Sequence, residues 1–419
     1  MTASSLLRFP AFARVLQGIE PYTHLVAAAR AAVYNDAQVV QFPYDWRLPV
    51  AHNAALLADR AAGALEEWRR NPDHDYLRRR HPTGRPAQLV IVAHSMGGLL
   101  ARYLSRIPGV IEHVRATVTL GTPFYGSAKA AVLLNTGRGA PLPLPARRPV
   151  RHLFEADVDD GVRRLAASLP GLHDLLPSYR CVNNGPPGRR LTEGDAVTLG
   201  GDPDLVANSW QLHRDLDTAT LAGHRCMVGT FQPTAQSLTI TDGIVTLHRG
   251  VWTDGTDAAR WIDDGGDGTV FRGSATLPGT GIAHTYLPQQ HGALARTDEA
   301  CTFARAVITE QDLDRLGPPL AGAGLGLDLP DLATPGEECI ATITGITRSR
   351  DATAVLIDLS NGQVIDRLAI HRRDGQWCAP IIADRPGLYR VEVAGGGYSA
   401  VQQLVLVTDP DLAADNHAA

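Results

Sequence analysis

A serine stands between an apolar run and two glycines in the stretch LVIVAHSMGGLLARYL, residues 89–104. The apolar run predicts a buried strand, and the leucines after the glycines are spaced as on one face of a helix. A serine on a cramped strand-to-helix turn exposes its hydroxyl, while the N-terminus of the next helix directs N–H groups at developing negative charge. Ser95 is therefore a candidate nucleophile, and the Met96 backbone N–H is a candidate oxyanion donor.

The turn departs from the G-x-S-x-G pattern of such nucleophiles at one position, where Ala93 replaces the first glycine. One methyl group two residues before the serine is a modest steric addition. The alternative interpretation is a tight turn with an incidental serine. The strand before it and the helix after it favour the nucleophile.

A nucleophilic serine needs a general base, and the base needs an acid that orients it. On a turn of this kind, the acid and then the histidine follow the serine on loops after later strands. The segment WIDDGGDGTVF, 261–271, offers Asp263, Asp264 and Asp267. Asp267 is the preferred acid, because it stands just before the strand-like TVF in a glycine-rich loop. The alternatives are a cluster of turn-forming residues and a calcium loop, which would need an acidic ligand at its twelfth position that this segment lacks.

Two histidines follow this segment, His284 and His291. The sequence AHTYLPQQHGALA predicts a strand over 284–287, a loop that contains a proline, and then a helix. His291 lies on that loop and is the preferred general base, whereas His284 lies within the strand and is expected to be structural. His94, the neighbour of the serine, is expected to pack beside the turn.

The elements around these residues alternate between helices and short apolar runs from about residue 10 to 310, which is typical of an α/β layer fold. Helices are expected over 12–32, over 50–70 and from Met96, and strands over 37–46, 88–94, 116–123 and 224–231. An irregular insertion at about 128–225 lies where α/β enzymes place lids over their sites.

The C-terminal part of the chain differs from the first part in its pattern of predicted elements. A proline- and glycine-rich linker is expected over 316–336, after a first domain of residues 1–315. Six short, often alternating segments then predict a small all-β, Ig-like sandwich over 337–410. Cys339 and Cys378 either pair across this sandwich or remain thiols.

Composition excludes several classes of function. The formal net charge of −5 and the absence of a basic stripe argue against a nucleic-acid partner. No apolar run is long enough to span a bilayer, and the start, MTASSLLRFP, lacks the pattern of a signal peptide, so we expect a cytoplasmic protein. The cysteines form no C-x-x-C pair, and GTPFYGSAK, 121–129, has serine where a phosphate loop needs lysine. We expect neither a metal nor a cofactor.

Lys129 is the only lysine in the sequence. The other basic residues are arginine and histidine, and alanine, glycine and aspartate are abundant. Such a composition is typical of a GC-rich, bacterial coding sequence and carries no functional signal.

Several motifs, taken in order, resemble the lecithin:cholesterol acyltransferase family of α/β-hydrolases. They are FPYDWRLP (42–49), AHSMGG (93–98), LGTPFYGS (120–127), LPGLHDLLPSY (169–179), GGDGTV (265–270) and QQHGAL (289–294). The likeness covers about residues 10–310, and PYDWR is its most specific motif. The resemblance implies a mostly parallel sheet with helices on both faces and a cap insertion. It also implies acyl transfer through a serine acyl-enzyme, with Ser95 as nucleophile, His291 as general base and acid, and Asp267 as the residue that orients the imidazole.

The resemblance further implies that the insertion at about 128–225 forms a cap over an acyl-chain pocket. Asp45, Trp46 and Arg47 would then lie at the edge of the cap region. The other interpretation of these three residues is a structural turn after a strand.

The start of the chain departs from the family. Residues 1–10 contain neither the apolar strand nor the glycine-containing loop that precede the first helix in the family. We therefore expect the N-terminal strand or strands of the sheet to be missing, with a gap between the strand at 37–46 and the strand before Ser95. The second oxyanion donor, which that loop supplies in the family, would be missing too. Either the reading frame begins upstream, or the chain is a degenerate homologue whose sheet pairs differently.

The predicted function is that of a lipid-ester acyltransferase or lipase. The substrate would be an acyl ester of a phospholipid or a neutral lipid, reached at a lipid surface. Hydrolysis is the default outcome, because transfer to an alcohol requires that water be excluded from the site. The alternative is a catalytically impaired homologue that acts as a binding or interaction protein. The sequence indicates no oligomeric state.

Overall fold

The computed structural model describes residues 22–136, 163–253, 258–277, 284–311, 324–395 and 399–408. A parallel sheet of four strands forms the centre of the first domain, in the order β1-β2-β3-β8. These strands are β1 (Leu89–His94), β2 (Val114–Leu120), β3 (His224–Thr230) and β8 (His284–Pro288). Apolar runs such as VIV and VTL suit them, because strands of a parallel sheet are covered on both faces.

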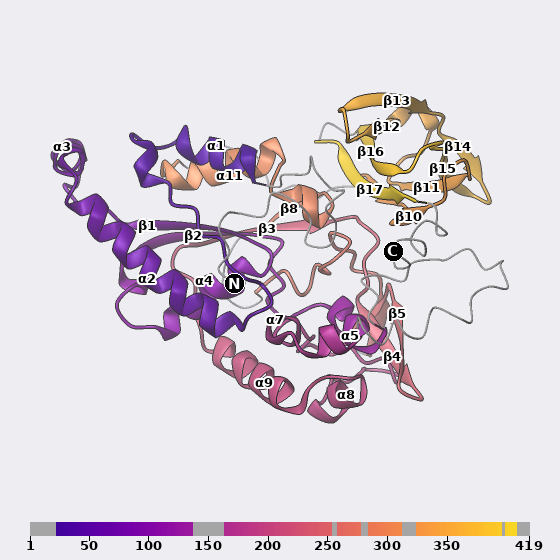
Figure 1. Ribbon diagram of the computed structural model, residues 1–419, viewed down its shortest axis with the longest axis horizontal. Coiled ribbons are helices and arrows are strands. Elements are labelled where there is room, and N and C mark those ends of the chain that lie inside the picture. The colour runs from indigo at the N-terminus through magenta and orange to yellow at the C-terminus, as the bar shows by residue number, and fades with distance from the viewer. Residues whose placement is uncertain are drawn as a thin grey trace, which may run out of the picture.

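Helices cover both faces of this sheet (Figure 1). On one face lie α1 (Thr23–Arg30) and α11 (Asp298–Ile308), which share an apolar core with β2, β3 and β8. On the other lie α2 (Val50–Arg69), α4 (Gly97–Tyr103) and α9 (Pro203–Asp217), whose core includes Cys226 and Val228 of β3. The short helix α3 (Pro72–Arg80) follows α2 at the far end of the domain. The first domain therefore has the expected α/β-hydrolase architecture.

The segment 37–46 does not form the strand that its sequence predicts. Asp36–Gln38 make a single 3-10 turn, η1, and residues 39–45 continue without strand pairing. Pro43 has no N–H to donate to a ladder, and within the described part of the chain β2 is the one strand paired with β1. Of the helix expected over 12–32, the structure has α1, and residues 12–21 lie outside the described ranges.

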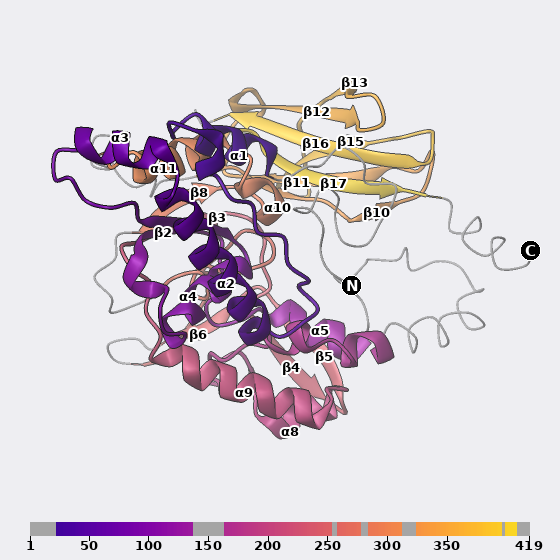
Figure 2. The same cartoon turned by 60° about the vertical axis from the view of Figure 1, so that its left-hand side comes forward.

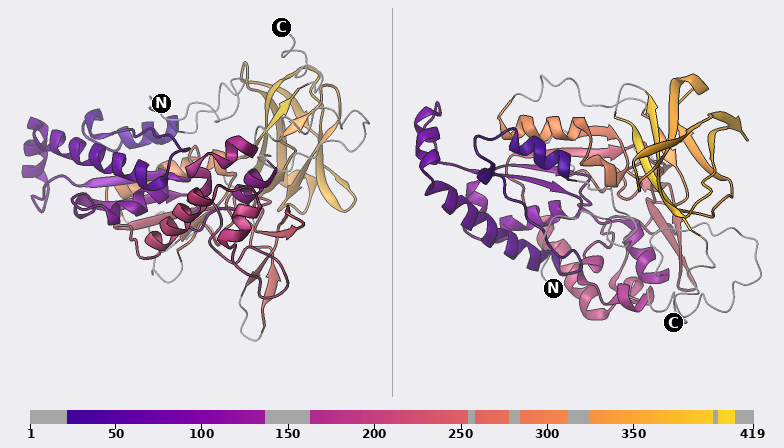
Figure 3. Two further views of the ribbon diagram at one scale, coloured as in Figure 1. Left: turned by 60° about the horizontal axis from the view of Figure 1, so that its bottom comes forward. Right: turned by 45° about the horizontal axis from the view of Figure 1, so that its top comes forward.

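The insertion that the sequence led us to expect as a cap begins with α5 (Ala128–Thr136) and continues, beyond the undescribed residues 137–162, with α7 (Pro170–His173) and α8 (Glu193–Thr198). Two hairpins after β3 adjoin it, namely β4 (Ser237–Thr241) with β5 (Ile244–His248), and β6 (Val251–Thr253) with β7 (Arg260–Ile262). Leu134, Leu172, Leu199 and Leu238 belong to one apolar cluster that joins α5, α7, the end of α8 and the β4–β5 hairpin. In the right-hand view of Figure 3, α5, α8 and the β4–β5 hairpin lie together on the lower side of the molecule, away from α1 and α11.

The C-terminal domain is the expected β-sandwich. One sheet has the order β10-β17-β16-β12-β13 and the other the order β14-β15-β11-β9. Their strands are β9 (Gly326–Asp328), β10 (Leu332–Ala333), β11 (Cys339–Thr344), β12 (Ala352–Asp358), β13 (Gln363–Leu368), β14 (His371–Arg373), β15 (Gln376–Ile381), β16 (Gly387–Gly395) and β17 (Val401–Val407). Buried side chains such as Leu327, Ile343, Leu356 and Val391 fill the space between the sheets.

The structure differs from the sequence-based expectation in the segment 324–336. That segment carries β9 and β10, which pair with β11 and β17, so part of the expected linker belongs to the sandwich sheets. Residues 312–323 lie outside the described ranges. Figures 1 and 2 place the sandwich against the end of β8, at the opposite end of the molecule from α3.

All five cysteines are free thiols. Cys339 and Cys378 lie on the neighbouring strands β11 and β15, but Cys339 faces Ile381 and Cys378 faces Thr342 in the register. The two sulfurs are therefore not joined. In the described ranges, each helix is too short or too polar to cross a bilayer.

Candidate active site

Ser95 sits on a strained turn between β1 and α4. Its φ is 55°, a left-handed conformation that side chains other than glycine rarely adopt. The turn is held by the Ser95 N–H, which donates to the carbonyl of Leu120 on β2 at 2.9 Å. The strained geometry expected for a nucleophile on a strand-to-helix turn is therefore present at this serine.

Ala93 fits this turn because its methyl group faces a glycine. A Cβ built on Gly97 would lie 3.7 Å from the Cβ of Ala93, which is ordinary contact distance. With glycine at position 97, the methyl group of Ala93 has still more room. The missing first glycine of the motif therefore leaves the turn intact.

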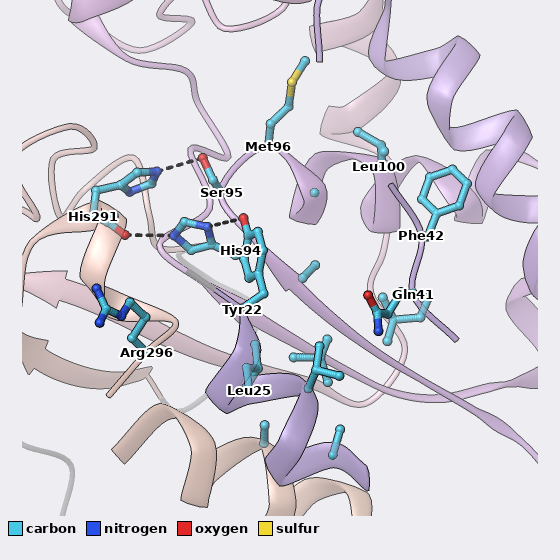
Figure 4. Close-up of a pocket in the computed structure, with 18 of the residues that line it drawn as sticks. Tyr22, Leu25, Gln41, Phe42, His94, Ser95, Met96, Leu100, His291 and Arg296 are labelled. Carbon is cyan, nitrogen blue, oxygen red and sulfur yellow. Dashed lines mark hydrogen bonds between the residues drawn. The ribbon is translucent and has the colours of Figure 1, made fainter. Parts of the chain in front are cut away.

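The structure brings Ser95, His291 and Asp267 into one chain of hydrogen bonds. The Ser95 Oγ and the His291 Nε2 are 2.8 Å apart, and the His291 Nδ1 and the Asp267 Oδ2 are 2.7 Å apart. The bond between Ser95 and His291 is visible in Figure 4. The Asp267 side chain is 1% exposed and that of His291 is 15% exposed, so solvent reaches the imidazole but not the carboxylate.

Backbone contacts orient the acid and the histidine. The Asp267 Oδ1 accepts the N–H groups of Thr269 and Val270 at 3.0 and 2.7 Å, which fixes the carboxylate with Oδ2 toward the imidazole. The His291 N–H donates to the Asp267 carbonyl at 2.7 Å, at the first residue of α10 (His291–Leu294). The neighbouring loop approaches so closely that a Cβ on Gly121 would lie 2.9 Å from the Asp267 Oδ2.

The other candidates lie elsewhere. Asp263 accepts a hydrogen bond from the Gln236 side chain, and Asp264 pairs with Arg272. His284 lies in β8 beside Tyr286, with ring centroids 6.3 Å apart. The described residues contain no group of three histidine, cysteine or acidic side chains placed to hold a metal ion.

The Met96 N–H opens α4 directly after Ser95. Within the described ranges no acceptor lies on this N–H, whereas the N–H groups of Gly98 and Leu99 donate to the Ser95 and Met96 carbonyls. The Met96 side chain is 4% exposed and packs with Leu99 and Phe124 in the core beside α4. The predicted oxyanion role requires an N–H without an acceptor of its own, and the Met96 N–H meets this requirement in the described part of the chain.

His94 anchors the histidine loop, a contact that the sequence did not indicate. The His94 Nε2 lies 2.9 Å from the carbonyl oxygen of His291, and its Nδ1 lies 3.0 Å from the Tyr22 hydroxyl (Figure 4). Burial lowers the pKa of His94 to about 3 and raises that of Tyr22 to about 12, so the imidazole is neutral and the phenol keeps its proton. A carbonyl only accepts, so Nε2 donates to His291 and Nδ1 accepts from Tyr22.

Substitutions at His94 test this anchor. We expect His94→Ala to lower kcat for ester hydrolysis about tenfold or more, because the loop that carries His291 loses a fixed point. His94→Gln retains an N–H donor near the position of Nε2, so it is expected to keep most of the activity. The measurement is kcat for both variants, and equal losses in the two would contradict the anchor.

The lowered pKa of His94 also predicts an effect of pH on the stability of the fold. The folded protein keeps His94 neutral down to about pH 3, whereas the unfolded chain binds a proton near the ordinary pKa of 6.5. The wild type therefore loses free energy of unfolding as the pH falls from 6.5 toward 3. His94→Gln lacks this contribution, so its melting temperature should fall less over that range.

Asp45, Trp46 and Arg47 lie where the loop before α2 meets α7 of the expected cap segment. The Arg47 carbonyl accepts the Gly171 N–H of α7 at 2.9 Å. The Arg47 side chain pairs with Asp45 at 2.7 Å and lowers the pKa of that carboxyl group. The Asp174 carboxylate, just after α7, accepts the first N–H of α2 from Val50 at 2.7 Å.

A cavity of about 1720 Å³ opens beside Ser95 and His291. It extends along β1 and is lined on its other side by the segment 39–44, where the sequence led us to expect a gap in the sheet. Apolar side chains form much of the wall, and Leu25, Phe42 and Leu100 are seen facing it in Figure 4. Lys129, from the start of α5, also lines the cavity, and burial lowers the pKa of its amine.

Comparison with known proteins gives one family match. A model of the lecithin:cholesterol acyltransferase family matches residues 14–153, a range that includes Ser95 and the PYDWR segment. No curated protein matches the chain. The fold and the family match together confirm the predicted resemblance in its coarse form.

Several solved structures are similar to this chain at low identity. The crystal structure of the Tle4-Tli4 complex has 18% identity and a TM-score of 0.39, over 63% of this chain and 67% of that chain. The Bacillus licheniformis lipase BlEst2 in its propeptide form has 11% identity and a TM-score of 0.31, over 86% and 84%. The Lin-41 filamin domain has 12% identity and a TM-score of 0.16, over 19% and 83%. The chain is therefore similar to the lecithin:cholesterol acyltransferase family over residues 14–153, and its parallel sheet with helices on both faces is of the α/β-hydrolase kind.

Proposed function

We propose that the chain hydrolyses or transfers acyl groups from lipid esters, with Ser95, His291 and Asp267 as its catalytic residues. The observation that carries the proposal is the chain of hydrogen bonds from the Ser95 Oγ through the imidazole to a buried carboxylate. The family match supports the coarser statement that the chain is a hydrolase or acyltransferase of lipid esters.

In the first half of the reaction, the Ser95 Oγ attacks the ester carbonyl while the His291 Nε2 takes its proton. Asp267 holds the other imidazole nitrogen, so the positive charge that forms on the ring lies beside a carboxylate. The Met96 N–H donates to the oxyanion of the tetrahedral intermediate, where the charge is greatest. His291 then gives its proton to the departing alcohol, which leaves an acyl group on Ser95.

In the second half, a water molecule or an alcohol attacks the acyl-enzyme. His291 removes its proton and returns it to the Ser95 Oγ, so that the enzyme is restored. Hydrolysis is the default, because the imidazole is in part open to solvent. Transfer to an alcohol requires closure of the site against water.

The cavity beside Ser95 supports an acyl chain as the group that is bound. Its apolar walls are typical of sites that bind hydrophobic ligands, and its volume leaves room for an acyl chain. The loop at Asp45 to Arg47 is bonded to α7 of the proposed cap, and its Trp46 lines the cavity. Contact with a lipid surface through the cap is part of the proposal.

A labelled fluorophosphonate tests the assembled site. Such a probe phosphonylates a serine only when a neighbouring base activates it, so we expect the full chain to be labelled once, at Ser95. Mass spectrometry of the labelled peptide identifies the residue, and Ser95→Ala serves as the unlabelled reference. A folded wild type that resists the probe would favour the alternative, a binding or interaction protein.

A further inference from the structure

The two glutamines before His291 reach out of the first domain to the β-sandwich. The Gln290 Nε2 donates to the Leu327 carbonyl of β9 at 2.9 Å and lies 3.3 Å from the Oε1 of Gln403 on β17. The Gln403 Nε2 in turn donates to the Leu329 carbonyl at 2.6 Å. The residue next to the histidine is therefore bonded to both sheets of the sandwich.

Gln289 makes a second connection. Its Nε2 donates to the Ala400 carbonyl at 2.9 Å, and its Oε1 accepts the Gln402 N–H at 3.3 Å. Ala400 immediately precedes β17, and the side chain of Gln289 is 1% exposed. A buried amide that loses its hydrogen bonds lowers the free energy of unfolding. The histidine loop and β17 therefore hold each other in position through Gln289.

The loop that carries Asp267 is connected to β9, the strand that Gln290 also contacts. The Gln232 Oε1 accepts the Leu327 N–H at 3.0 Å, and its Nε2 donates to the Leu325 carbonyl at 2.9 Å. The Gln232 N–H donates to the carbonyl of Gly266, the residue before the acid, at 2.9 Å. Gln232 also lies 3.3 Å from the Gln290 amide, so one cluster joins the acid loop, the histidine loop and β9.

The contact between the domains is close as well as polar. A Cβ built on Gly326 of β9 would lie 2.4 Å from the carbonyl oxygen of Phe231, at the end of β3. Glu299, in the first turn of α11, accepts the backbone N–H and the hydroxyl of Ser399 at 2.9 and 2.6 Å. Figure 2 shows α10 directly below β11 and β17. A sandwich joined to the first domain only through a flexible linker would not show such close packing.

We propose that the β-sandwich is a working part of the active site, with Gln232, Gln290 and Gln403 as positioning residues for the Asp267–His291 pair. In the described part of the chain, none of the three side chains is bonded to the side chain of Ser95, His291 or Asp267. Gln290 and Gln403 also line the cavity beside Ser95. All three act by fixing the two loops against β9 and β17. The inference rests on the proposed function for its activity readout. It deepens that function by assigning a role to the second domain.

Methionine variants of the full chain separate the hydrogen bonds from packing. Gln290→Met and Gln403→Met keep the length of the side chain but remove its donors and acceptors. The matched control is Gln363→Met, because Gln363 is exposed on β13, at the opposite edge of the sheet that contains β17. We expect kcat for a p-nitrophenyl ester to fall about tenfold to a hundredfold in the first two variants, and KM to stay unchanged, because misplacement of a catalytic group has costs of this order. The control should equal the wild type.

A spectroscopic readout makes the test independent of turnover. The proton between the His291 Nδ1 and the Asp267 carboxylate should give a far-downfield proton NMR signal, lost or broadened in Gln290→Met and Gln403→Met but retained in the control. A wild type that shows this signal but hydrolyses no ester would overturn the proposed function alone. Unchanged kcat and an unchanged signal in both interface variants would overturn this inference, even if their melting temperatures fall.

Discussion

Replacement of Ser95 by alanine is expected to lower kcat for p-nitrophenyl esters by a factor on the order of 10⁴ or more. The variant lacks the atom that attacks the carbonyl, so no acyl-enzyme forms and His291 has no hydroxyl to activate. The substitution should leave the turn folded, because the Ser95 hydroxyl bonds only to the imidazole among the described contacts and the backbone bond to Leu120 is retained. Initial rates at saturating ester give the measurement.

The control for this substitution is Ser360→Ala. Ser360 is exposed in the turn between β12 and β13 of the sandwich, far from the proposed site. The Ser360→Ala variant should hydrolyse esters as fast as the wild type. If Ser95→Ala hydrolysed them equally fast, the assignment of the nucleophile would be wrong.

The second large effect is expected from Asp267→Asn. In the wild type the Asp267 Oδ1 accepts two backbone N–H groups, and an asparagine oxygen takes over these bonds. The new amide NH₂ group then faces the His291 Nδ1 and forces the imidazole proton onto Nε2. A protonated Nε2 cannot accept the Ser95 proton, so kcat should fall by a factor on the order of 10³ to 10⁴.

Asp263→Asn offers a control on the same loop. The Asp263 Oδ1 accepts the N–H of Gly265 and a Gln236 amide, and an asparagine oxygen can accept both. Its kcat should therefore remain near that of the wild type. Comparable losses in the two variants would mean that the loop as a whole matters and that Asp267 has no special role.

The sequence was most informative where chemistry and local structure coincide. The run before Ser95, the glycines after it and the acid-then-histidine order follow from short patterns, because a strained turn constrains the residues around it. The structure brings the three predicted side chains together, and their catalytic roles remain predictions. The six predicted segments fall on strands of the sandwich, and they were predictable for the same reason, since alternation along a strand is a local property.

Other features depend on partners far along the chain. The segment 37–46 has the apolar composition of a strand, yet whether it pairs depends on a neighbour that its own sequence does not encode. Gln290 and Tyr22 have no local pattern at all, because one bonds to β9 and β17 and the other to His94. The Pro- and Gly-rich composition of the segment before Cys339 indicated a linker. That prediction missed β9 and β10, because these strands form only by pairing with residues far along the chain.

The position of Lys129 has a practical consequence for chemical labelling. It is the only lysine in the sequence, and it lines the cavity beside Ser95. Burial lowers its pKa, so a larger fraction of this amine is neutral and nucleophilic at a given pH than for a lysine in solvent. Amine-directed reagents therefore meet one lysine side chain in the whole protein. The extent of its modification, with and without a bound acyl chain, reports directly on whether the cavity is occupied.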